Sequence, residues 1–285
     1  MKPAPFTYHA PTTVDAALAV LAEVGPQDGR VLAGGQSLLP TMAFRLARPA
    51  HLVDINGIAA LSDMRNEAGE LAIGACVRHA AFHRPVSDGP LGKLLSAVVR
   101  HIAHYPIRVR GTFCGSLAHA DPASEWALVA ATLGATVVAR SRNGTRKIAS
   151  DRYFKGPLMT DLKSDELLAE ARLPLLPGDT RLGFYEFSRR AGDYAIAMSL
   201  ATFRVRDGRI VEPRIGVGGA EGVPRRILAA EQALAGQTPT ENAFGGAADA
   251  AAAAVDPMED AQASAGYRRD LVRTVVHRAL RQAAL

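Results

Sequence analysis

Apolar residues recur along this chain with two different periods, so both helices and strands are expected. After Thr13, apolar positions at helical spacing over 14–21 predict a capped helix that ends near the Gly-Pro pair that follows. Short apolar runs at 31–32 and 51–55 predict strands. Between these strands, the apolar positions of residues 37–46 predict a second helix.

The same alternation of strands and helices continues to the end of the chain. Apolar spacing over 90–102 and 126–133 predicts two more helices, and residues 225–285 are expected to be mostly helical. Asn143-Gly144 and Asp207-Gly208 are typical of hairpin turns. The remaining predicted strands are 71–75, 135–139, 167–173, 184–189, 197–206 and 214–219. This order of elements predicts an α+β fold.

A glycine pair lies between the strand predicted at 31–32 and the next helix. Gly34 and Gly35 permit positive φ and a close approach of a ligand to the backbone. The free N–H groups of a helix that begins after Ser37, its expected N-cap, favour an anion, and Pro40 is tolerated in the first turn. The spacing matches neither a P-loop nor a dinucleotide G-x-G-x-x-G motif. Alone, such a pair is more typical of an ordinary strand-to-helix turn.

A second glycine-bearing stretch, within residues 111–125, changes that interpretation. Thr112, Gly115 and Ser116 offer backbone N–H groups and hydroxyls where glycine permits close approach. Asp121 and Glu125 add carboxylates suited to ribose hydroxyls. Two such loops from neighbouring subdomains are expected to hold both ends of a pyrophosphate.

Composition limits the class of protein. The chain has 285 residues, 48% of them apolar, which is enough for a sizeable core and two or three subdomains. No apolar run approaches the ~18 residues of a membrane span, and the first residues lack the apolar segment of a signal peptide, so a cytoplasmic protein is expected. The net charge of +5 is scattered, which argues against a nucleic-acid surface. One arginine cluster is expected to be a solvated helix face, with an acidic partner as the alternative: Arg268, Arg269, Arg273, Arg278 and Arg281.

Cysteines and histidines give no strong metal signal. Cys76 and Cys114 are the only cysteines, too few for an iron–sulfur or zinc site with four cysteine ligands in this chain. His101, His104 and His119 invite a metal interpretation, but no clear carboxylate or thiolate complement accompanies them. No metal site is therefore expected, and His119 is expected to contact a cofactor or to hold its loop.

Three motifs in order carry a family resemblance: 33–40 (AGGQSLLP), 108–122 (RVRGTFCGSLAHADP) and 189–195 (RRAGDYA). Together they resemble the FAD-binding medium subunit of the molybdenum hydroxylases, the group of carbon monoxide dehydrogenase and the xanthine dehydrogenase-like enzymes. Residues 264–269 also resemble the C-terminal domain of that family, so the resemblance covers nearly the whole chain.

The resemblance implies a fold and the boundaries of its domains. An FAD-binding domain of the vanillyl-alcohol-oxidase (PCMH) type is expected in two α+β subdomains, at 1–57 and 58–176. A C-terminal domain of a small sheet packed with helices is expected at 177–285.

The resemblance also implies the site. Residues 33–37 and 112–116 are expected to hold the FAD pyrophosphate, and Asp193 with Tyr194 to close over the flavin ring. Core packing is the alternative role for Tyr194. No side chain is expected to act as a catalytic acid or base. The residues expected to bind FAD are Ala33, Gly34, Gly35, Gln36, Ser37, Leu38, Ile102, Thr112, Gly115, Ser116, His119, Asp121, Glu125, Leu168, Asp193 and Tyr194.

One position departs from the family pattern, because Cys114 stands where the family has the first glycine of a pair. A Cβ atom there is tolerated only if Cys114 has negative φ or points away from the phosphate. A small buried side chain is a better interpretation than a redox thiol.

The implied function is electron transfer by an oxidoreductase subunit. FAD in this chain would take electrons from two [2Fe-2S] clusters of a small subunit, while a large subunit with a molybdenum-pterin cofactor oxidises the organic substrate. NAD, oxygen or a quinone would be the terminal acceptor, and a dimer of heterotrimers the assembly. The alternatives are a stand-alone flavin oxidase or reductase and a nucleotide-binding module without a redox role. The sequence names neither the organic substrate nor the acceptor.

Overall fold

The N-terminal part of the chain is a small parallel sheet. The computed structural model describes residues 2–285. Its first sheet has the order β1-β3-β2, and both strand pairs are parallel. The strands are β1 (Thr7–His9), β2 (Gly29–Leu32) and β3 (His51–Asp54), with α1 (Val14–Val24) and α2 (Leu38–Ala43) in the two connections. As predicted, Thr13 caps α1 and accepts a hydrogen bond from the Ala16 N–H at 3.2 Å.

A five-stranded antiparallel sheet follows, with the order β4-β5-β10-β6-β7. Its strands are β4 (Met64–Glu67), β5 (Glu70–Gly74), β6 (Thr136–Ser141), β7 (Gly144–Ala149) and β10 (Leu167–Pro174). The β6–β7 connection is the predicted tight hairpin, since Ser141 pairs with Gly144. Four helices connect β5 to β6: α3 (Gly89–Val98), α4 (Tyr105–Arg108), α5 (Phe113–His119) and α6 (Glu125–Leu133). A short helix and a two-stranded ribbon precede β10: α7 (Ser150–Tyr153), β8 (Phe154–Gly156) and β9 (Met159–Thr160).

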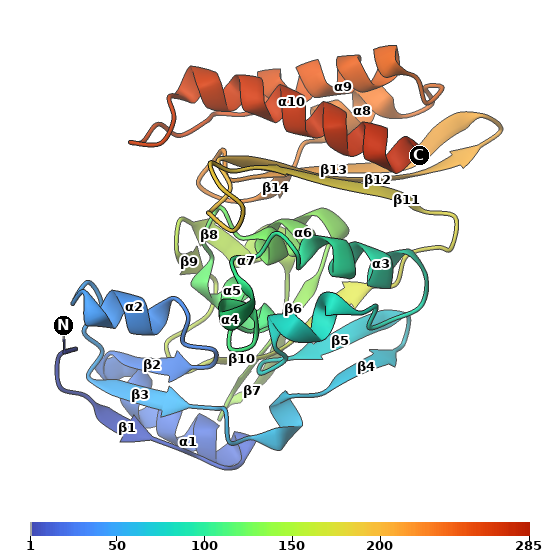
Figure 1. Ribbon diagram of the computed structural model, residues 1–285. Helices are drawn as coiled ribbons and strands as arrows, with labels where there is room; N and C mark the ends of the chain where they lie inside the picture. The colour runs from blue at the N-terminus through green and yellow to red at the C-terminus, as the bar shows by residue number, and fades with distance from the viewer. Residues whose placement is uncertain (1) are drawn as a thin grey trace.

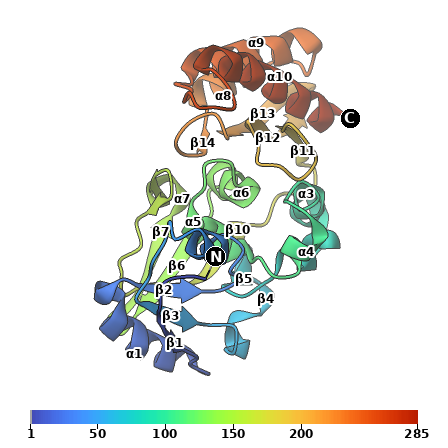
Figure 2. The ribbon, with the colours of Figure 1, turned by 60° about the vertical axis from the view of Figure 1, so that its left-hand side comes forward.

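The C-terminal part is a four-stranded antiparallel sheet with helices on one face. The strands are β11 (Arg181–Phe187), β12 (Ala197–Arg206), β13 (Arg209–Gly218) and β14 (Arg225–Arg226). The helices α8 (Leu228–Leu234), α9 (Glu241–Ala254) and α10 (Ala265–Ala284) cover its outer face (Figure 1). The other face lies over α6, which contacts β12 and β13, and Figure 2 shows the same arrangement from a second direction. Helix α6 therefore joins the two halves of the molecule.

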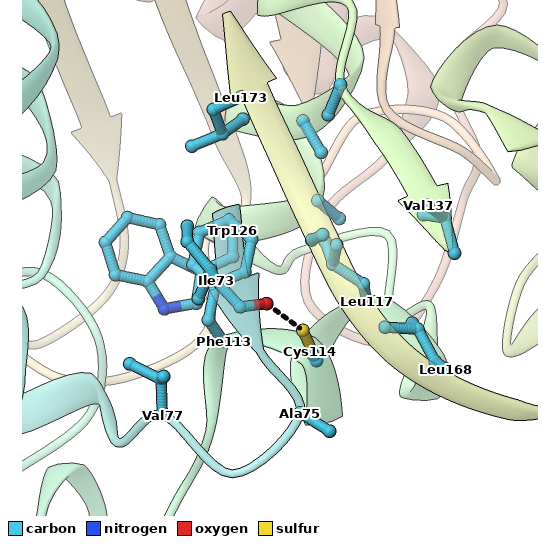
Figure 3. Packing of buried hydrophobic residues seen from close by; sticks show 14 of the residues in the cluster. Ile73, Ala75, Val77, Phe113, Cys114, Leu117, Trp126, Val137, Leu168 and Leu173 are labelled. Atoms are coloured by element: carbon cyan, nitrogen blue, oxygen red, sulfur yellow. Dashed lines mark hydrogen bonds between the residues drawn. The ribbon is translucent and has the colours of Figure 1, made fainter. Parts of the chain in front are cut away.

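The hydrophobic core has two parts. One cluster joins α1, the antiparallel sheet and helices α3, α5 and α6, and its centre is an aromatic group of Phe82, Phe113 and Trp126 with ring centroids 5.0–5.7 Å apart. Cys114 lies in this cluster, and its Sγ donates to the Ile73 carbonyl at 3.4 Å (Figure 3). The second cluster fills the space between the C-terminal sheet and its helices. The two N-terminal sheets therefore share one core.

The structure corrects several predicted element limits. Helix α2 ends at Ala43 and not at residue 46, because Arg45 adopts a left-handed φ of 57°, and Phe44 and Leu46 are exposed. Helix α3 likewise ends at Val98, before Ile102. Residues 113–119, expected as part of a loop, are helical.

The arginine cluster at the C-terminus was also only partly predicted. Arg268 is buried and donates to the Ile196 and Gly219 carbonyls at 2.8 and 2.6 Å, so α10 is not a purely solvated face there. Arg273 pairs with Asp249 and Arg281 with Glu241, both on the neighbouring helix α9. These arginines bind groups of their own chain. Among residues 2–285, no helix is both long and apolar enough to cross a membrane.

Candidate functional site

Two glycine-bearing segments from different parts of the chain lie in direct contact. We call residues 33–37 the first glycine segment and residues 111–116 the second glycine segment. A Cβ atom added at Gly34 would lie 2.5 Å from the carbonyl oxygen of Arg110 and 2.6 Å from the Cα atom of Gly111. Glycine at position 34 is therefore required for the two backbones to approach each other.

The first glycine segment leaves its backbone donors free. Over the part of the chain that the structure describes, the N–H groups of Gly34, Gly35, Gln36 and Ser37 donate to no protein acceptor. Gly35 has a φ of 71°, and its carbonyl accepts the Leu39 N–H at 3.0 Å. The Ser37 side chain makes no capping hydrogen bond, so it does not cap α2 as predicted. Consecutive free N–H groups at a helix start form a concave site suited to an anion.

The second glycine segment is the first turn of α5, and most of its donors are used. Thr112 is the N-cap, and its Oγ1 accepts the Gly115 N–H at 2.9 Å. The Ser116 N–H donates to the Thr112 carbonyl and the Phe113 N–H to the Val77 carbonyl, both at 3.1 Å. The Thr112 and Cys114 N–H groups have no acceptor among residues 2–285, and the Ser116 hydroxyl is half-buried.

A polar network behind the two segments holds them together. Asn56 Nδ2 donates to the Ala33 carbonyl at 2.8 Å, and Arg78 donates both to Asn56 Oδ1 and to the Arg110 carbonyl, each at 2.5 Å. Asp54 accepts from the Asn56 N–H at 2.9 Å. Partial burial opposes ionisation of Asp54, but hydrogen bonds from Tyr8 and Asn56 outweigh it and lower its pKa. Asn56 and Arg78 were missed in the sequence, where they look like ordinary loop residues.

A buried histidine, His79, packs against the second glycine segment. The backbone N–H of His79 donates to the Gly111 carbonyl at 2.9 Å. The Trp126 Nε1–H donates to the ring atom Nδ1 of His79, also at 2.9 Å. Because indole nitrogen only donates, the neutral ring must carry its proton on Nε2. Burial, with the charges of Arg108 and Arg78, lowers the pKa of His79 to about 3. His79 is therefore a neutral structural support.

Two buried carboxyl groups lie where the halves of the molecule meet. Glu125 is the first residue of α6, and Glu186 lies on β11 with its side chain 3% exposed. Burial raises the pKa of both residues; Asp121 adds to the effect on Glu125, and Glu125 to the effect on Glu186. The imidazole of His101 lies close to Glu186, with its Nδ1 3.8 Å from Glu186 Oε2. Glu186 was missed in the sequence, where a single Glu in a strand carries no signal.

The segment that carries Asp193 and Tyr194 packs against the loop of Ala103 and His104. Gly192 has a φ of 86°, and a Cβ atom there would lie 2.6 Å from the His104 ring. Tyr194 is 61% exposed, so core packing, the alternative considered for it, is wrong. Desolvation and the charges of Asp121 and Glu125 raise the pKa of Tyr194.

The remaining predicted residues differ in accessibility. Ala33, Gln36 and Leu38 are half-buried beside the glycines, as are His119 and Asp121 at the end of α5. Ile102 and Leu168 are buried in the first core cluster, so each can present only an edge to a ligand.

Within residues 2–285, no group of three or more His, Cys, Asp or Glu side chains is arranged to hold a metal ion. A surface hollow of about 440 Å³ between α1 and the β6–β7 hairpin is lined by none of the predicted site residues.

Comparison with known proteins gives matches over the whole length. Residues 4–176 match the FAD binding domain in molybdopterin dehydrogenase, and residues 183–283 match the CO dehydrogenase flavoprotein C-terminal domain. The nicotine 6-hydroxylase medium subunit of Paenarthrobacter nicotinovorans is 36% identical over 283 residues, 99% of each chain. A structure of carbon monoxide dehydrogenase from Hydrogenophaga pseudoflava superposes with a TM-score of 0.95 at 36% identity, covering 100% of this chain and 99% of that one. Quinoline 2-oxidoreductase from Pseudomonas putida 86 gives a TM-score of 0.93 at 36% identity, with 100% and 98% coverage.

Proposed function

This chain belongs to the FAD-binding medium subunits of the molybdenum hydroxylases, and we propose from that premise that it is the electron-transfer subunit of such an oxidoreductase. It takes electrons from the [2Fe-2S] clusters of a small subunit and passes them to a terminal acceptor. The observation that carries the proposal is the contact between the two glycine segments, with free N–H groups on the first.

The residues of this contact fit the diphosphate of FAD. The first glycine segment contributes consecutive N–H donors, which suit phosphate oxygens. The second glycine segment contributes the Ser116 hydroxyl on a rigid helix turn. FAD, when bound here, supplies the ability to accept electrons singly or in pairs.

The other predicted residues position the flavin part of the cofactor. Asp193 and Tyr194 cover the flavin ring, and the large flat phenol of Tyr194 excludes water from it. Ile102 and Leu168 give apolar edges, while Asp121, Glu125 and His119 lie on the ribose side. No side chain of this set serves as general acid or base for an organic substrate. The proposal includes every site residue predicted from the sequence. It also includes a domain division into residues 1–57, 58–176 and 177–285.

The names of the relatives support an assembly of several subunits. The nicotine 6-hydroxylase relative is a medium subunit, and the carbon monoxide dehydrogenase relative of Hydrogenophaga pseudoflava, which is 34% identical, is a medium chain. We therefore propose a large subunit with the molybdenum-pterin cofactor and a small iron–sulfur subunit as partners, in a dimer of heterotrimers. These names favour the complex over a stand-alone oxidase. A cytoplasmic location is part of the same proposal.

The test is to prepare the chain alone and together with its partner subunits. The chain alone should bind FAD, seen by its absorption in the blue and near ultraviolet, and should reduce artificial acceptors with a nicotinamide donor. It should oxidise the organic substrate only in the complex. Turnover of an organic substrate by the isolated chain would identify a stand-alone enzyme, and a colourless, FAD-free protein that regains no flavin would contradict the proposal.

A further inference from the structure

Residues 264–269 carry part of the family resemblance, yet none of them belongs to the proposed FAD site. They form the N-cap and the first turn of α10, where Ser264 Oγ accepts the Tyr267 N–H at 3.3 Å. In this turn Arg268 is 2% exposed, whereas its neighbours Tyr267 and Arg269 are exposed. A buried guanidinium is costly unless its donors are paired, so the partners of Arg268 indicate its role.

Arg268 binds the base of the hairpin loop between β11 and β12. We call residues 188–195 of this hairpin the covering loop, because Tyr194 lies in it. The Ile196 N–H donates to the Phe187 carbonyl at 2.9 Å and closes the loop, and Arg268 Nη1 donates to the Ile196 carbonyl at 2.8 Å. The guanidinium thus holds the end of the loop from the side of α10.

The same guanidinium connects the covering loop to two other parts of the chain. Arg268 Nη1 also donates to the Gly219 carbonyl at 2.6 Å, and the Gly219 N–H donates to the Pro122 carbonyl at 2.8 Å. Arg268 Nη2 pairs with Asp260 at 2.6 Å. Because Pro122 follows α5, the helix that begins in the second glycine segment, Arg268 links the covering loop to the connection between α5 and α6.

Two further contacts join the covering loop and its base to the start of α10. Arg189 Nη2 donates to the Gln262 carbonyl at 3.2 Å. The rings of Phe187 and Tyr267 meet edge-on, with centroids 6.4 Å apart. The first turn of α10 and the loop before it therefore contact the hairpin on both of its sides.

The covering loop has few bonds of its own. Within residues 2–285, every hydrogen bond between two groups of this loop ends at the Arg190 carbonyl. Tyr194 is 61% exposed, so packing does not fix its side chain. Contacts from outside must set the position of such a loop. The contact of Gly192 with the His104 ring holds its tip, and the start of α10 holds its base.

We propose that Arg268 is a positioning residue that fixes the covering loop, and with it Tyr194, over the flavin. The inference rests on the proposed function, which places the flavin under Tyr194. Arg268 acts through the backbone of Ile196, while Tyr194 contacts the cofactor. The C-terminal domain therefore serves the FAD site as a fixed support for its cover.

Hydrogen exchange of the flavin-free protein tests the contact itself. Arg268→Met removes the bonds to the two carbonyls and to Asp260 but keeps an apolar side chain. Amide exchange in the peptide 187–197 should become at least about tenfold faster, because the end of the loop loses its partner. Arg214→Met is the matched control, since it removes a half-buried arginine that donates to the Leu133 carbonyl, and exchange in 187–197 should not change.

A second variant, Tyr267→Ala, decides the test if Arg268→Met does not fold. It removes the ring that packs on Phe187, and Tyr267 is 47% exposed, so the fold should tolerate the truncation. Exchange in 187–197 should change in the same direction as in Arg268→Met, and less. Circular dichroism shows which variants are folded.

A double-variant cycle on the FAD-bound protein separates positioning from a general loss of stability. Tyr194→Ala and Arg268→Met should each raise the FAD dissociation constant about tenfold, and the combined variant also about tenfold rather than about 100-fold, because Arg268 acts through Tyr194. Arg214→Met should show no such coupling to Tyr194→Ala. Iodide quenching of the flavin fluorescence should rise in Arg268→Met to the level of Tyr194→Ala, which reports the lost cover.

The outcomes separate the two proposals. Unchanged exchange in Arg268→Met and Tyr267→Ala, or additive effects of Arg268→Met and Tyr194→Ala on FAD binding, overturns the positioning role and leaves the proposed function standing. Failure of the wild type to bind FAD overturns the proposed function, and the role of Arg268 toward the flavin falls with it.

Discussion

The two glycine segments of the site both combine glycine with serine, but they differ in how many of their N–H groups the fold uses. Within residues 2–285, the first segment, residues 33–37, leaves four consecutive N–H groups without a protein acceptor. The second, residues 111–116, uses most of its N–H groups within the fold, namely those of Gly111, Phe113, Gly115 and Ser116. The difference teaches that glycine content alone does not make an anion site. What matters is which donors the fold leaves free.

Glycine also serves different purposes in the two segments. Gly35 is needed for its positive φ, whereas Gly34 and Gly111 are needed because another group occupies the space of a Cβ atom. At Gly111 that group is the His79 ring, only 2.6 Å from the added atom. Packing therefore requires glycine at positions 34 and 111, and backbone conformation requires it at position 35.

The largest expected effect comes from breaking the contact between the segments with Gly34→Val. Its Cβ atom would overlap the Arg110 carbonyl, so the backbones must separate, at a cost of about 3 kcal/mol in unfolding free energy. FAD binding should weaken at least about 100-fold, which corresponds to about 2.7 kcal/mol. Flavin titration and urea unfolding measure the two effects. Gly57→Val is the control, since its Cβ atom would meet nothing closer than 3.7 Å, and equal FAD binding in both variants would contradict the assigned contact.

Several features of the fold were predictable from the sequence, because recognisable motifs and short-range rules decide them. The family, the α+β class, the cap of α1 and the hairpin turns at Asn143 and Asp207 were predicted and are confirmed. The cap and the hairpin turns each depend on a few neighbouring residues, and the family on three motifs that can be recognised along the chain. The burial of Cys114 also agrees with its interpretation as a packing residue.

The rest depends on contacts between residues far apart in the sequence. The bonds that join Asn56 and Arg78 to the two segments, and the burial of Glu186 beside His101, appear only when separate elements come together. No spacing rule reports such pairs. The overlong prediction for α2 has a local cause, the left-handed Arg45, but arginine carries no turn signal.

Acid should affect the second segment more than the first. The pKa of His79 is lowered to about 3 in the folded protein, against 6.5 as its ordinary value, so the unfolded chain binds the proton more strongly. The stability that neutral His79 gives is complete above pH 6.5 and is lost as pH falls toward 3, with a limiting slope of about 1.4 kcal/mol per unit. Urea unfolding between pH 7.5 and 5 measures the slope. His79→Phe should flatten it and the surface variant His277→Gln should not; an unchanged slope in His79→Phe would remove His79 from this role.

A smaller effect is expected at Gly35, where the backbone is left-handed. An alanine with positive φ costs about 1–2 kcal/mol, and Gly69→Ala carries the same strain at a φ of 80° with nothing within 4 Å. Both variants should lose stability in thermal unfolding, and Gly35→Ala somewhat more, because its Cβ atom would also lie 3.0 Å from Leu39 and 3.2 Å from Leu32. Only Gly35→Ala should also weaken FAD binding, by about tenfold or 1.4 kcal/mol, because it alters the N–H cradle. Equal FAD affinity in the two variants would show that the first segment does not bind the diphosphate.

The smallest expected effects come from two side chains of the second glycine segment, Thr112 and Ser116. They distinguish residues that stabilise the fold from residues that bind FAD. Thr112→Val removes the cap of α5 and should cost about 1 kcal/mol of stability, as Thr240→Val should at the N-cap of α9. Ser116→Ala removes a hydroxyl that serves no cap, so the stability of the protein should be nearly unchanged. If this hydroxyl donates to a phosphate oxygen, FAD binding should weaken about fivefold, which is about 1 kcal/mol. Unfolding and flavin titration on the three variants measure this. A stability loss in Ser116→Ala without a change in FAD affinity would mean that the whole second segment is scaffold, and that the free N–H groups of residues 34–37 alone bind the diphosphate.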